Sequence, residues 1–145
     1  SHRPEDLETM LKYIDQADVV QGSRYVKGGC IIGWGFKRRI ISWGANTLIR
    51  LLYRTGIRDH TGNYRVYNRR LVEDILKYTE YNGYEWVVEA LLVAKRLGYR
   101  IVEAPITFIN RERGESKLGV SDILKWFKSI IKLKTRRLKT VQNQE

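Results

Sequence analysis

The residues best suited to chemistry in this sequence are basic, and they gather where acidic residues are missing. No Asp or Glu occurs between Asp18 and Asp59. That stretch holds Arg24, Lys27, Lys37, Arg38, Arg39, Arg50, Arg54 and Arg58. Clustered cations suit polyanions, anionic lipid surfaces or phosphorylated substrates, and composition does not choose among the three. The more ordinary alternative is that these cations form a basic surface that faces solvent and binds no specific partner.

A second basic stretch follows Asp122 and holds Lys125, Lys128, Lys132, Lys134, Arg136, Arg137 and Lys139. Over the whole chain the formal net charge is +11. The single Cys30 excludes an internal disulfide. Two histidines and one cysteine are also too few for a convincing zinc site. The lack of an internal disulfide fits a reducing, cytosol-facing setting.

The elements that must position these residues alternate between helices and strands. Apolar residues at helical spacing predict helices over 4–16, 37–53, 70–78, 84–97 and 121–139. A buried strand is predicted over 17–21, a short strand over 64–67 and an alternating strand over 100–109, with Pro105 at an edge or a bulge. The glycine-rich segment from Lys27 to Gly35 is predicted to be a loop. This order favours an α/β layer architecture with too few strands for a complete sheet.

Two of the predicted helices are amphipathic and basic. The apolar positions of the 37–53 helix make it amphipathic, with its basic residues on the other face; they are Ile40, Ile41, Ala45, Leu48, Leu51 and Leu52. The 121–139 helix places Ile123, Leu124, Phe127, Ile130 and Ile131 on one stripe. This last helix can lie on an anionic membrane surface, or pack its stripe on the domain, or do both. No stretch approaches the roughly 18 apolar residues of a membrane span.

Three groups of short motifs follow one another along the chain. The first comprises GSRYVKGG at 22–29, Trp34 and RRIISWGA at 38–45; the second is RDHTGNYR at 58–65; the third is VEAPITF at 102–108 with RGESKL at 113–118. Together, in this order, they resemble the polyprenyl-phosphate glycosyltransferases of glycosyltransferase family 2, and dolichyl-phosphate mannose synthases in particular. The second group departs from the family's usual Ser-Gly-Phe by having Gly62-Asn63-Tyr64.

The resemblance implies the C-terminal part of a GT-A, Rossmann-like glycosyltransferase domain, with an incomplete mixed sheet, flanking helices and a C-terminal amphipathic helix. It divides the chain into an acceptor-side half domain, 1–120, and a membrane-interface helix with a polar tail, 121–145. The chain opens on Ser1-His2-Arg3-Pro4-Glu5 without an initiator Met. In the family's pattern such a stretch follows the metal-binding Asp-x-Asp pair. We therefore expect that pair upstream of Ser1 and expect this piece to be inactive alone.

The reaction implied by the resemblance transfers mannose from GDP-mannose to dolichyl or another polyprenyl phosphate, with inversion and with Mg²⁺ or Mn²⁺ in the full-length enzyme. The enzyme would act at the cytoplasmic face of a membrane, as a peripheral protein on an anionic surface. A phosphate monoester is mostly dianionic at pH 7, so this nucleophile needs no general base.

The resemblance also implies roles for individual residues. Arg24, Arg38 and Ser42 match the acceptor-phosphate site, and the segment from Lys27 to Gly35 matches an acceptor loop that opens for lipid entry. Arg38 and Ser42 are four residues apart, so one helix face can present both to one phosphate. Arg113, Ser116 and Lys117 match the donor-diphosphate site. Asp59 is assigned to catalysis, either organising the site or capping a turn.

Several other interpretations stay open. The closest keeps the fold and transfers glucose or aminoarabinose instead of mannose. A second is a basic module that binds nucleic acid. The sequence contains no known nucleic-acid-binding motif, and we do not expect nucleic acid to be a partner. A third is a half-protein that acts as a scaffold or as part of a split enzyme. Without the resemblance, Arg24 and Arg113 would be ordinary surface or salt-bridged residues.

Overall fold

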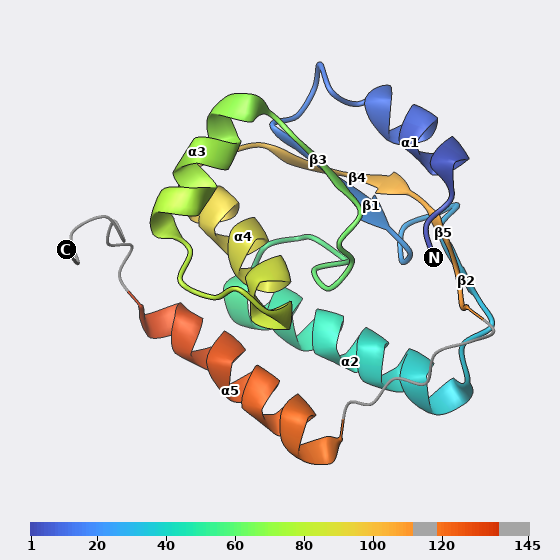
Figure 1. Ribbon diagram of the computed structural model, residues 1–145, viewed down its shortest axis with the longest axis vertical. Helices are drawn as coiled ribbons and strands as arrows, with labels where there is room; N and C mark the ends of the chain where they lie inside the picture. The colour runs from blue at the N-terminus through green and yellow to red at the C-terminus, as the bar shows by residue number, and fades with distance from the viewer. Residues whose placement is uncertain (112–118, 137–145) are drawn as a thin grey trace.

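The computed structural model describes residues 1–111 and 119–136, and these form a mixed α/β architecture (Figure 1). The strands are β1 (Val19–Ser23), β2 (Cys30–Ile32), β3 (Arg65–Tyr67), β4 (Ile101–Pro105) and β5 (Thr107–Ile109). The helices are α1 (Pro4–Leu11), α2 (Phe36–Tyr53), α3 (Arg69–Tyr78), α4 (Tyr84–Arg96) and α5 (Val120–Thr135). The predicted alternation of helices and strands is confirmed.

The main sheet has the order β3-β1-β4 and is mixed, as expected. Strand β1 pairs in parallel with β4, from Val19 opposite Ile101 to Ser23 opposite Pro105. It pairs antiparallel with β3, with Val19 opposite Tyr67. All five residues of β1 are buried. Among the described strands β4 lies at an edge, which is where a residue without an N–H such as Pro105 is tolerated.

The strand predicted over 100–109 is interrupted, because β4 and β5 belong to different sheets. The amide of Ile106 donates to the carbonyl of Ser23 at 3.0 Å, and the carbonyl of Ile106 accepts from the amide of Cys30 at 3.0 Å. Ile106 is thus the residue at which the chain passes from one sheet to the other. Beyond it, β5 pairs in parallel with β2.

The prediction that 27–35 is all loop is wrong, because Cys30–Ile32 forms β2. Glycines allow the tight approach on its N-terminal side. A Cβ on Gly29 would lie 2.5 Å from the carbonyl oxygen of Ser23, so only glycine fits against this turn. The end of β1 and the start of β2 are therefore held side by side by backbone contact.

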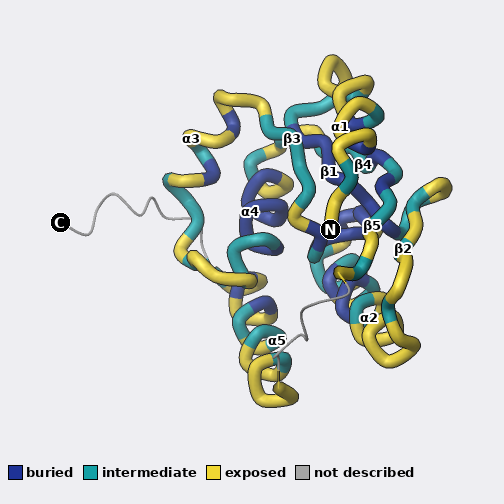
Figure 2. Tube along the Cα trace, turned by 45° about the vertical axis from the view of Figure 1, so that its right-hand side comes forward, coloured by how far each residue is buried: buried dark blue, intermediate teal, exposed yellow. Residues whose placement is uncertain are grey.

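Helices cover both faces of the main sheet, and successive residues of β1 point to opposite sides. Val19 packs with Leu71 and Ile75 of α3 and with Leu91 of α4. Val20 packs with Met10 of α1 and with residues of and beside β4. Figure 2 shows the resulting burial, with β1 and α4 forming the interior.

A third cluster packs α2 and α5 on the outer side of α4. It joins Ile49 of α2, Val88 and Leu92 of α4, and Ile130 and Leu133 of α5. Only part of the apolar face of α2 is covered by the described residues: Ala45 and Ile49 are buried, while Ile40, Ile41, Leu48 and Leu51 are exposed. The division of the chain at residue 120 stays a prediction.

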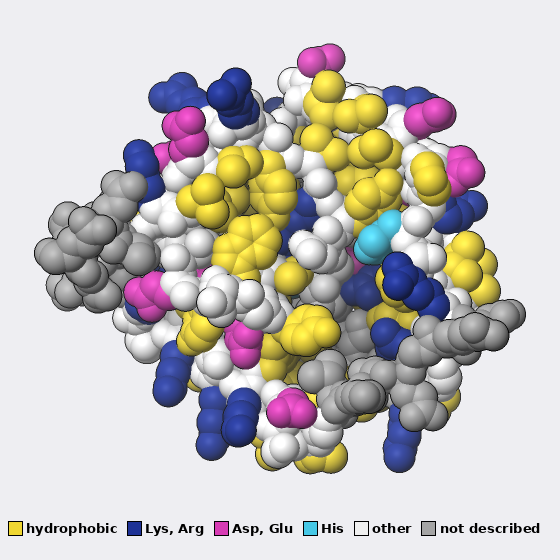
Figure 3. Space-filling view, in the orientation of Figure 1, with side chains coloured by type: hydrophobic (Ala, Val, Ile, Leu, Met, Phe, Trp, Pro, Cys, Tyr) yellow, Lys and Arg dark blue, Asp and Glu magenta, His cyan; other side chains and the backbone are white. Residues whose placement is uncertain are grey.

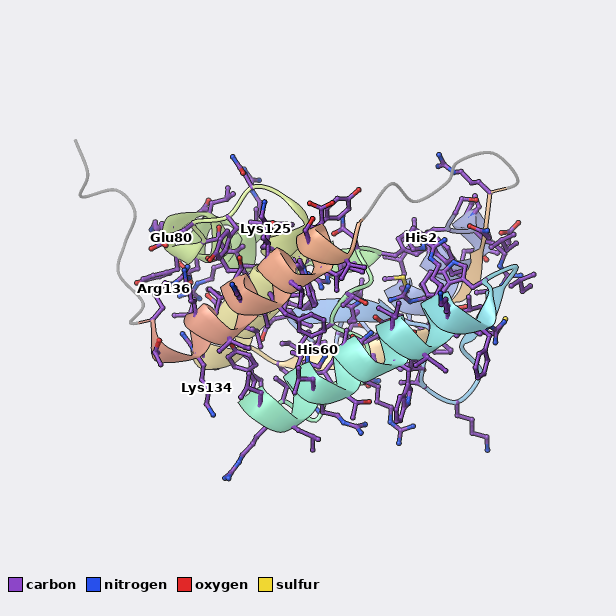
Figure 4. All side chains as sticks on the ribbon, turned by 90° about the horizontal axis from the view of Figure 1, so that it is seen from below. His2, His60, Glu80, Lys125, Lys134 and Arg136 are labelled. Atoms are coloured by element: carbon purple, nitrogen blue, oxygen red, sulfur yellow. The ribbon has the colours of Figure 1, made fainter. Side chains whose placement is uncertain are left out.

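The C-terminal end of α5 is attached to α4 by polar contacts. Arg96 donates to the carbonyls of Leu133 at 2.5 Å, Lys134 at 3.2 Å and Arg136 at 2.9 Å. The carbonyls at the end of a helix have no amide donor within the helix, so Arg96 supplies the hydrogen bonds that they lack. Arg136 pairs with the fully buried Glu89 at 2.6 Å and lies beside Glu80 (Figure 4).

Two helix ends differ from their predicted positions. Helix α1 ends at Leu11 rather than near residue 16, because Lys12 and Tyr13 make tighter bonds to Thr9 and Met10, three residues back. Helix α5 ends at Thr135, and the predicted extension to residue 139 lies partly outside the described residues.

We expect Gly29→Ala to lower the free energy of unfolding by about 1–3 kcal/mol, because the added methyl would overlap the backbone of Ser23. Gly44→Ala is the matched control: it lies in α2 with no atom within 4 Å of its Cβ, and a helical alanine should stabilise by about 0.5–1 kcal/mol. Urea unfolding of both variants measures the difference. Equal effects would contradict the close approach at Gly29.

Candidate functional site

The centre of the candidate site is a buried ion pair between Arg24 and Asp59. Arg24 directly follows β1, and Asp59 lies in the turn between α2 and β3. The guanidinium meets the carboxylate through Nε–Oδ2 and Nη2–Oδ1, both 2.8 Å, a bidentate geometry. The backbone amide of Arg24 adds a third bond to Oδ2 at 3.0 Å. Asp59 is completely buried, so this pair fixes the end of β1 to the turn.

Asp59 also caps its own turn, because its Oδ1 accepts the amide of Gly62 at 3.0 Å. Burial alone would raise the pKa of Asp59, but the hydrogen bonds and charge of Arg24 outweigh burial and hold that pKa below its usual range. Asp59 is therefore an anion whose oxygens are already bonded. Of the two roles considered for Asp59, the structure shows the cap of the turn, and its role in catalysis stays a prediction.

A second carboxylate supports the same turn from β4. Glu103 accepts the backbone amides of Arg58 at 3.0 Å and Asp59 at 2.9 Å. Burial raises the pKa of Glu103 above its ordinary value, although these amides partly offset the effect. Glu103 thus holds the backbone of Asp59 while Arg24 holds its side chain.

Helix α2 is joined to this turn through Asn46. Its Oδ1 accepts the amides of His60 at 2.7 Å and Thr61 at 3.3 Å, and its Nδ2 donates to the Thr61 hydroxyl at 3.0 Å. The same hydroxyl accepts Nη2 of Arg24 at 2.9 Å. Thr61 therefore connects the ion pair to α2.

Trp34 lies against two arginines in front of the ion pair. The guanidinium carbon of Arg38 is 4.1 Å from its ring centroid and that of Arg24 is 5.2 Å away. Phe108 packs edge-on against the same indole at 5.4 Å. Cations over an indole face are attracted by its negative quadrupole. Partial burial and the charge of Arg24 lower the pKa of Arg38, so the two cations oppose each other here.

A cleft of about 770 Å³ lies between α2, α4 and α5, and we call it the α2–α5 cleft. Arg38 and Ser42 of α2 lie on one wall together with Thr61, and the charged residues Lys37, Glu85, Asp122 and Lys125 also line the cleft. Apolar residues make up much of the remainder, among them Trp34, Ile41, Val88, Ile123, Trp126 and Phe127. The Ser42 hydroxyl is 2.6 Å from the Tyr25 hydroxyl, which fixes its position at the wall. The cleft can accept an amphiphile with a polar head and an apolar tail.

The structure brings together some of the residues predicted for the site. Arg38 and Ser42 line one cleft, which agrees with their spacing on one helix. Arg24 lies behind the wall, in contact with Thr61, and its charge is paired with Asp59. Their roles in binding phosphate stay predictions. Arg113, Ser116 and Lys117 lie outside the described residues.

Sequence reasoning missed four residues that hold this site together: Trp34 as an arginine platform, Asn46, Thr61 and Glu103. Asn46 carried a usable signal, since it is a polar residue on the narrow face of α2 that also bears Ala45 and Ile49. Thr61 lies in the motif at 58–65 and Glu103 in the motif at 102–108, but no role was predicted for either residue. Their partners are distant in sequence, so spacing could not identify them.

Among residues 1–111 and 119–136, no group of three or more His, Cys, Asp or Glu is placed to hold a metal ion. The two carboxylates of the site already bind Arg24 and backbone amides. These residues therefore do not fit the divalent cation that the resemblance implies. Within the same residues, no helix combines the length and the apolar character needed to cross a bilayer.

We expect Asp59→Asn to cost about 3–5 kcal/mol in stability, because it leaves the guanidinium of Arg24 buried without its counter-charge. Combining it with Arg24→Met should cost less than the sum of the two single changes, since the double variant buries no unpaired charge. Denaturant unfolding of the wild type, both single variants and the double variant measures this coupling. Additive costs would contradict the ion pair.

The buried His60 predicts a pH dependence of stability. Its Nε2 is 2.7 Å from the Thr55 hydroxyl, and burial lowers its pKa from 6.5 to about 4. The unfolded chain then binds more protons than the folded one between these values, so stability is complete above pH ~6.5 and falls as pH drops, by up to about 3 kcal/mol. His60→Gln should flatten this slope, while the exposed His2→Gln should keep most of it. Equal slopes in pH-dependent urea titrations would argue against His60.

No family model matches the chain. It is 42% identical over 125 residues to a polyprenol monophosphomannose synthase of Mycolicibacterium smegmatis, covering 85% of this chain and 47% of that protein. It is 41% identical over 120 residues to an undecaprenyl-phosphate mannosyltransferase of Micrococcus luteus, covering 82% and 49%. The chain spans about half the length of the curated relatives it matches. Over that half, it is a homologue of the polyprenyl-phosphate mannosyltransferases, as its motifs indicated.

Proposed function

We propose that this chain provides the acceptor-binding part of an enzyme that transfers mannose from GDP-mannose to a polyprenyl phosphate. The observation that carries the proposal is the α2–α5 cleft, where Arg38 and Ser42 share a wall and apolar side chains line much of the rest. A lipid phosphate has the same division into an anionic head and an apolar chain. The names of the two relatives support this class of acceptor and the sugar.

In this proposal Arg38 and Ser42 bind the phosphate of the acceptor. Arg38 can offer a planar fork to phosphate oxygens, and Trp34 holds that fork by its face. Arg24 lies one contact behind, where Thr61 links it to the cleft wall. Two unit negative charges about 5 Å apart repel by roughly 3 kcal/mol at an effective dielectric near 20, so cations at this wall lower the barrier between acceptor and donor.

The proposed step forms a bond from a phosphate oxygen of the lipid to C1 of mannose and breaks the bond from C1 to the diphosphate. The electron pair of the broken bond leaves with GDP. Attack from the side opposite the leaving group inverts C1. No residue is required to remove a proton, because the phosphate nucleophile is already mostly dianionic at neutral pH.

The proposal also includes three expectations about the complete protein that come from the sequence. They are a GT-A domain, a divalent cation in the complete protein and a site at the cytoplasmic face of a membrane. In α5, buried Ile130 and Leu133 face the domain, while Leu124 and Ile131 and several lysines are exposed. This arrangement supports the expectation that one helix both packs on the domain and meets anionic lipid.

We expect Arg38→Ala in the complete gene product to lower kcat/KM for a polyprenyl phosphate about 30- to 1000-fold, the loss of a charge-assisted donor worth about 2–4 kcal/mol. Arg69→Ala, which removes an exposed arginine of α3, is the matched control and should leave turnover unchanged. Transfer of labelled mannose from GDP-mannose into extractable lipid measures both. UDP-glucose in parallel tests the donor.

Unchanged transfer by Arg38→Ala would refute the assignment of the acceptor phosphate to this wall. Arg38→Lys should restore only part of the rate, because an ammonium group keeps the charge but not the bidentate fork. Full restoration would show that charge alone is sufficient there.

A further inference from the structure

Thr61 lies in the turn between α2 and β3 and lines the α2–α5 cleft together with Arg38 and Ser42. Its hydroxyl oxygen accepts two hydrogen bonds, from Nη2 of Arg24 at 2.9 Å and from Nδ2 of Asn46 at 3.0 Å. A hydroxyl group has two lone pairs that can accept and one proton that it can donate. Both lone pairs of Thr61 are therefore in use, and its proton remains available for donation.

Neither partner of Thr61 can exchange roles with it. A guanidinium has no acceptor, so Arg24 can only donate. The amide of Asn46 is oriented by its other contacts, because its Oδ1 accepts the backbone amides of His60 at 2.7 Å and Thr61 at 3.3 Å. Its Nδ2 also donates to the carbonyl of Ser42 at 2.9 Å. Turning this amide over would set N–H groups against N–H groups and oxygen against oxygen, so the direction of each bond is fixed.

Among residues 1–111 and 119–136 the Thr61 hydroxyl donates to no acceptor. We propose that it donates a hydrogen bond to the phosphate of the lipid acceptor, as a third group on the wall that carries Arg38 and Ser42. The inference rests on the proposed function and adds a binding residue to it. A phosphate dianion has only acceptor oxygens, and all three of these side chains can donate to it.

The bond from Arg24 strengthens the Thr61 hydroxyl as a donor. A cationic group that donates to Oγ1 draws electron density from the O–H bond, and hydrogen bonds in such a chain polarise one another. Arg24 itself is held by Asp59 through two bonds of 2.8 Å, so Thr61 is the group through which its charge acts on the phosphate. Lys and Arg side chains also gather above α2, toward the N-terminus of the chain (Figure 3), and they favour the approach of an anion.

The test uses isothermal titration calorimetry of the complete gene product with two ligands, a short, water-dispersible polyprenyl phosphate and the polyprenol from which it is made. We expect Thr61→Val to raise the Kd for the phosphate about 10- to 100-fold, because a hydrogen bond to a charged group is lost. The Kd for the alcohol should change less than about twofold. A purely structural role of Thr61 would weaken both ligands alike.

Three further variants complete the test. Thr61→Ser keeps the hydroxyl and should bind the phosphate as the wild type does. Thr61→Ala removes the hydroxyl without placing a methyl group against Arg24 and Asn46, so it serves where valine does not fold. Thr47→Val is the matched control, since Thr47 belongs to α2 but is not among the described residues that line the cleft. It should leave both Kd values unchanged. Circular dichroism checks that each variant is folded.

Three results would overturn the inference: phosphate binding unaffected by loss of the hydroxyl, equal weakening of both ligands, or a Thr61→Ser variant as weak as Thr61→Val. Mannose transfer to the same lipid phosphate is assayed in parallel. Binding and transfer that depend on Arg38 but not on Thr61 refute the role of Thr61 alone. Phosphate binding that depends on Thr61, without any mannose transfer, refutes the proposed function alone.

Discussion

The buried ion pair between Arg24 and Asp59 is the constraint on which the site depends. Its two members come from the end of β1 and from the turn before β3, and neither charge is stable in that interior without the other. The remaining contacts follow from it. Glu103 fixes the backbone beneath Asp59, Thr61 meets the guanidinium, and Asn46 brings α2 to the same turn. Arg24 also contacts Thr61, a residue that lines the cleft, so the ion pair is connected to the cleft wall.

The helices that pack around α4 position the walls of the cleft relative to this ion pair. Helix α4 is buried along Val88–Ala94 and packs α3 on one side and α2 and α5 on another. Because α2 is tied both to the turn through Asn46 and to α4 through Ile49, Arg38 and Ser42 are held on a rigid wall. The opposite wall is α5, whose position depends on Ile130, Leu133 and the contacts of Arg96 and Arg136.

The sequence predicted most elements because their local patterns agree with their final environment. Helix α4 is rich in apolar residues and is buried along Val88–Ala94, and β1 begins with Val19 and Val20 and is buried throughout. The failures arose where burial depends on distant partners. In α2 the apolar pattern predicted an amphipathic helix, but only a narrow strip of it meets the described residues, so most of its apolar side chains are exposed. In 27–35 the glycines indicated a loop, yet pairing with β5, far along the chain, forms β2. The Arg24–Asp59 pair was likewise invisible, because spacing cannot show which charges meet.

The attachment of α5 has a consequence for how such a protein can vary. Its C-terminal carbonyls are bound by Arg96, and Arg136 reaches the buried Glu89, so the position of the helix is set by α4. A substitution of Arg96 or Glu89 can therefore change the distance across the cleft without altering Arg38 or Ser42 on the α2 side.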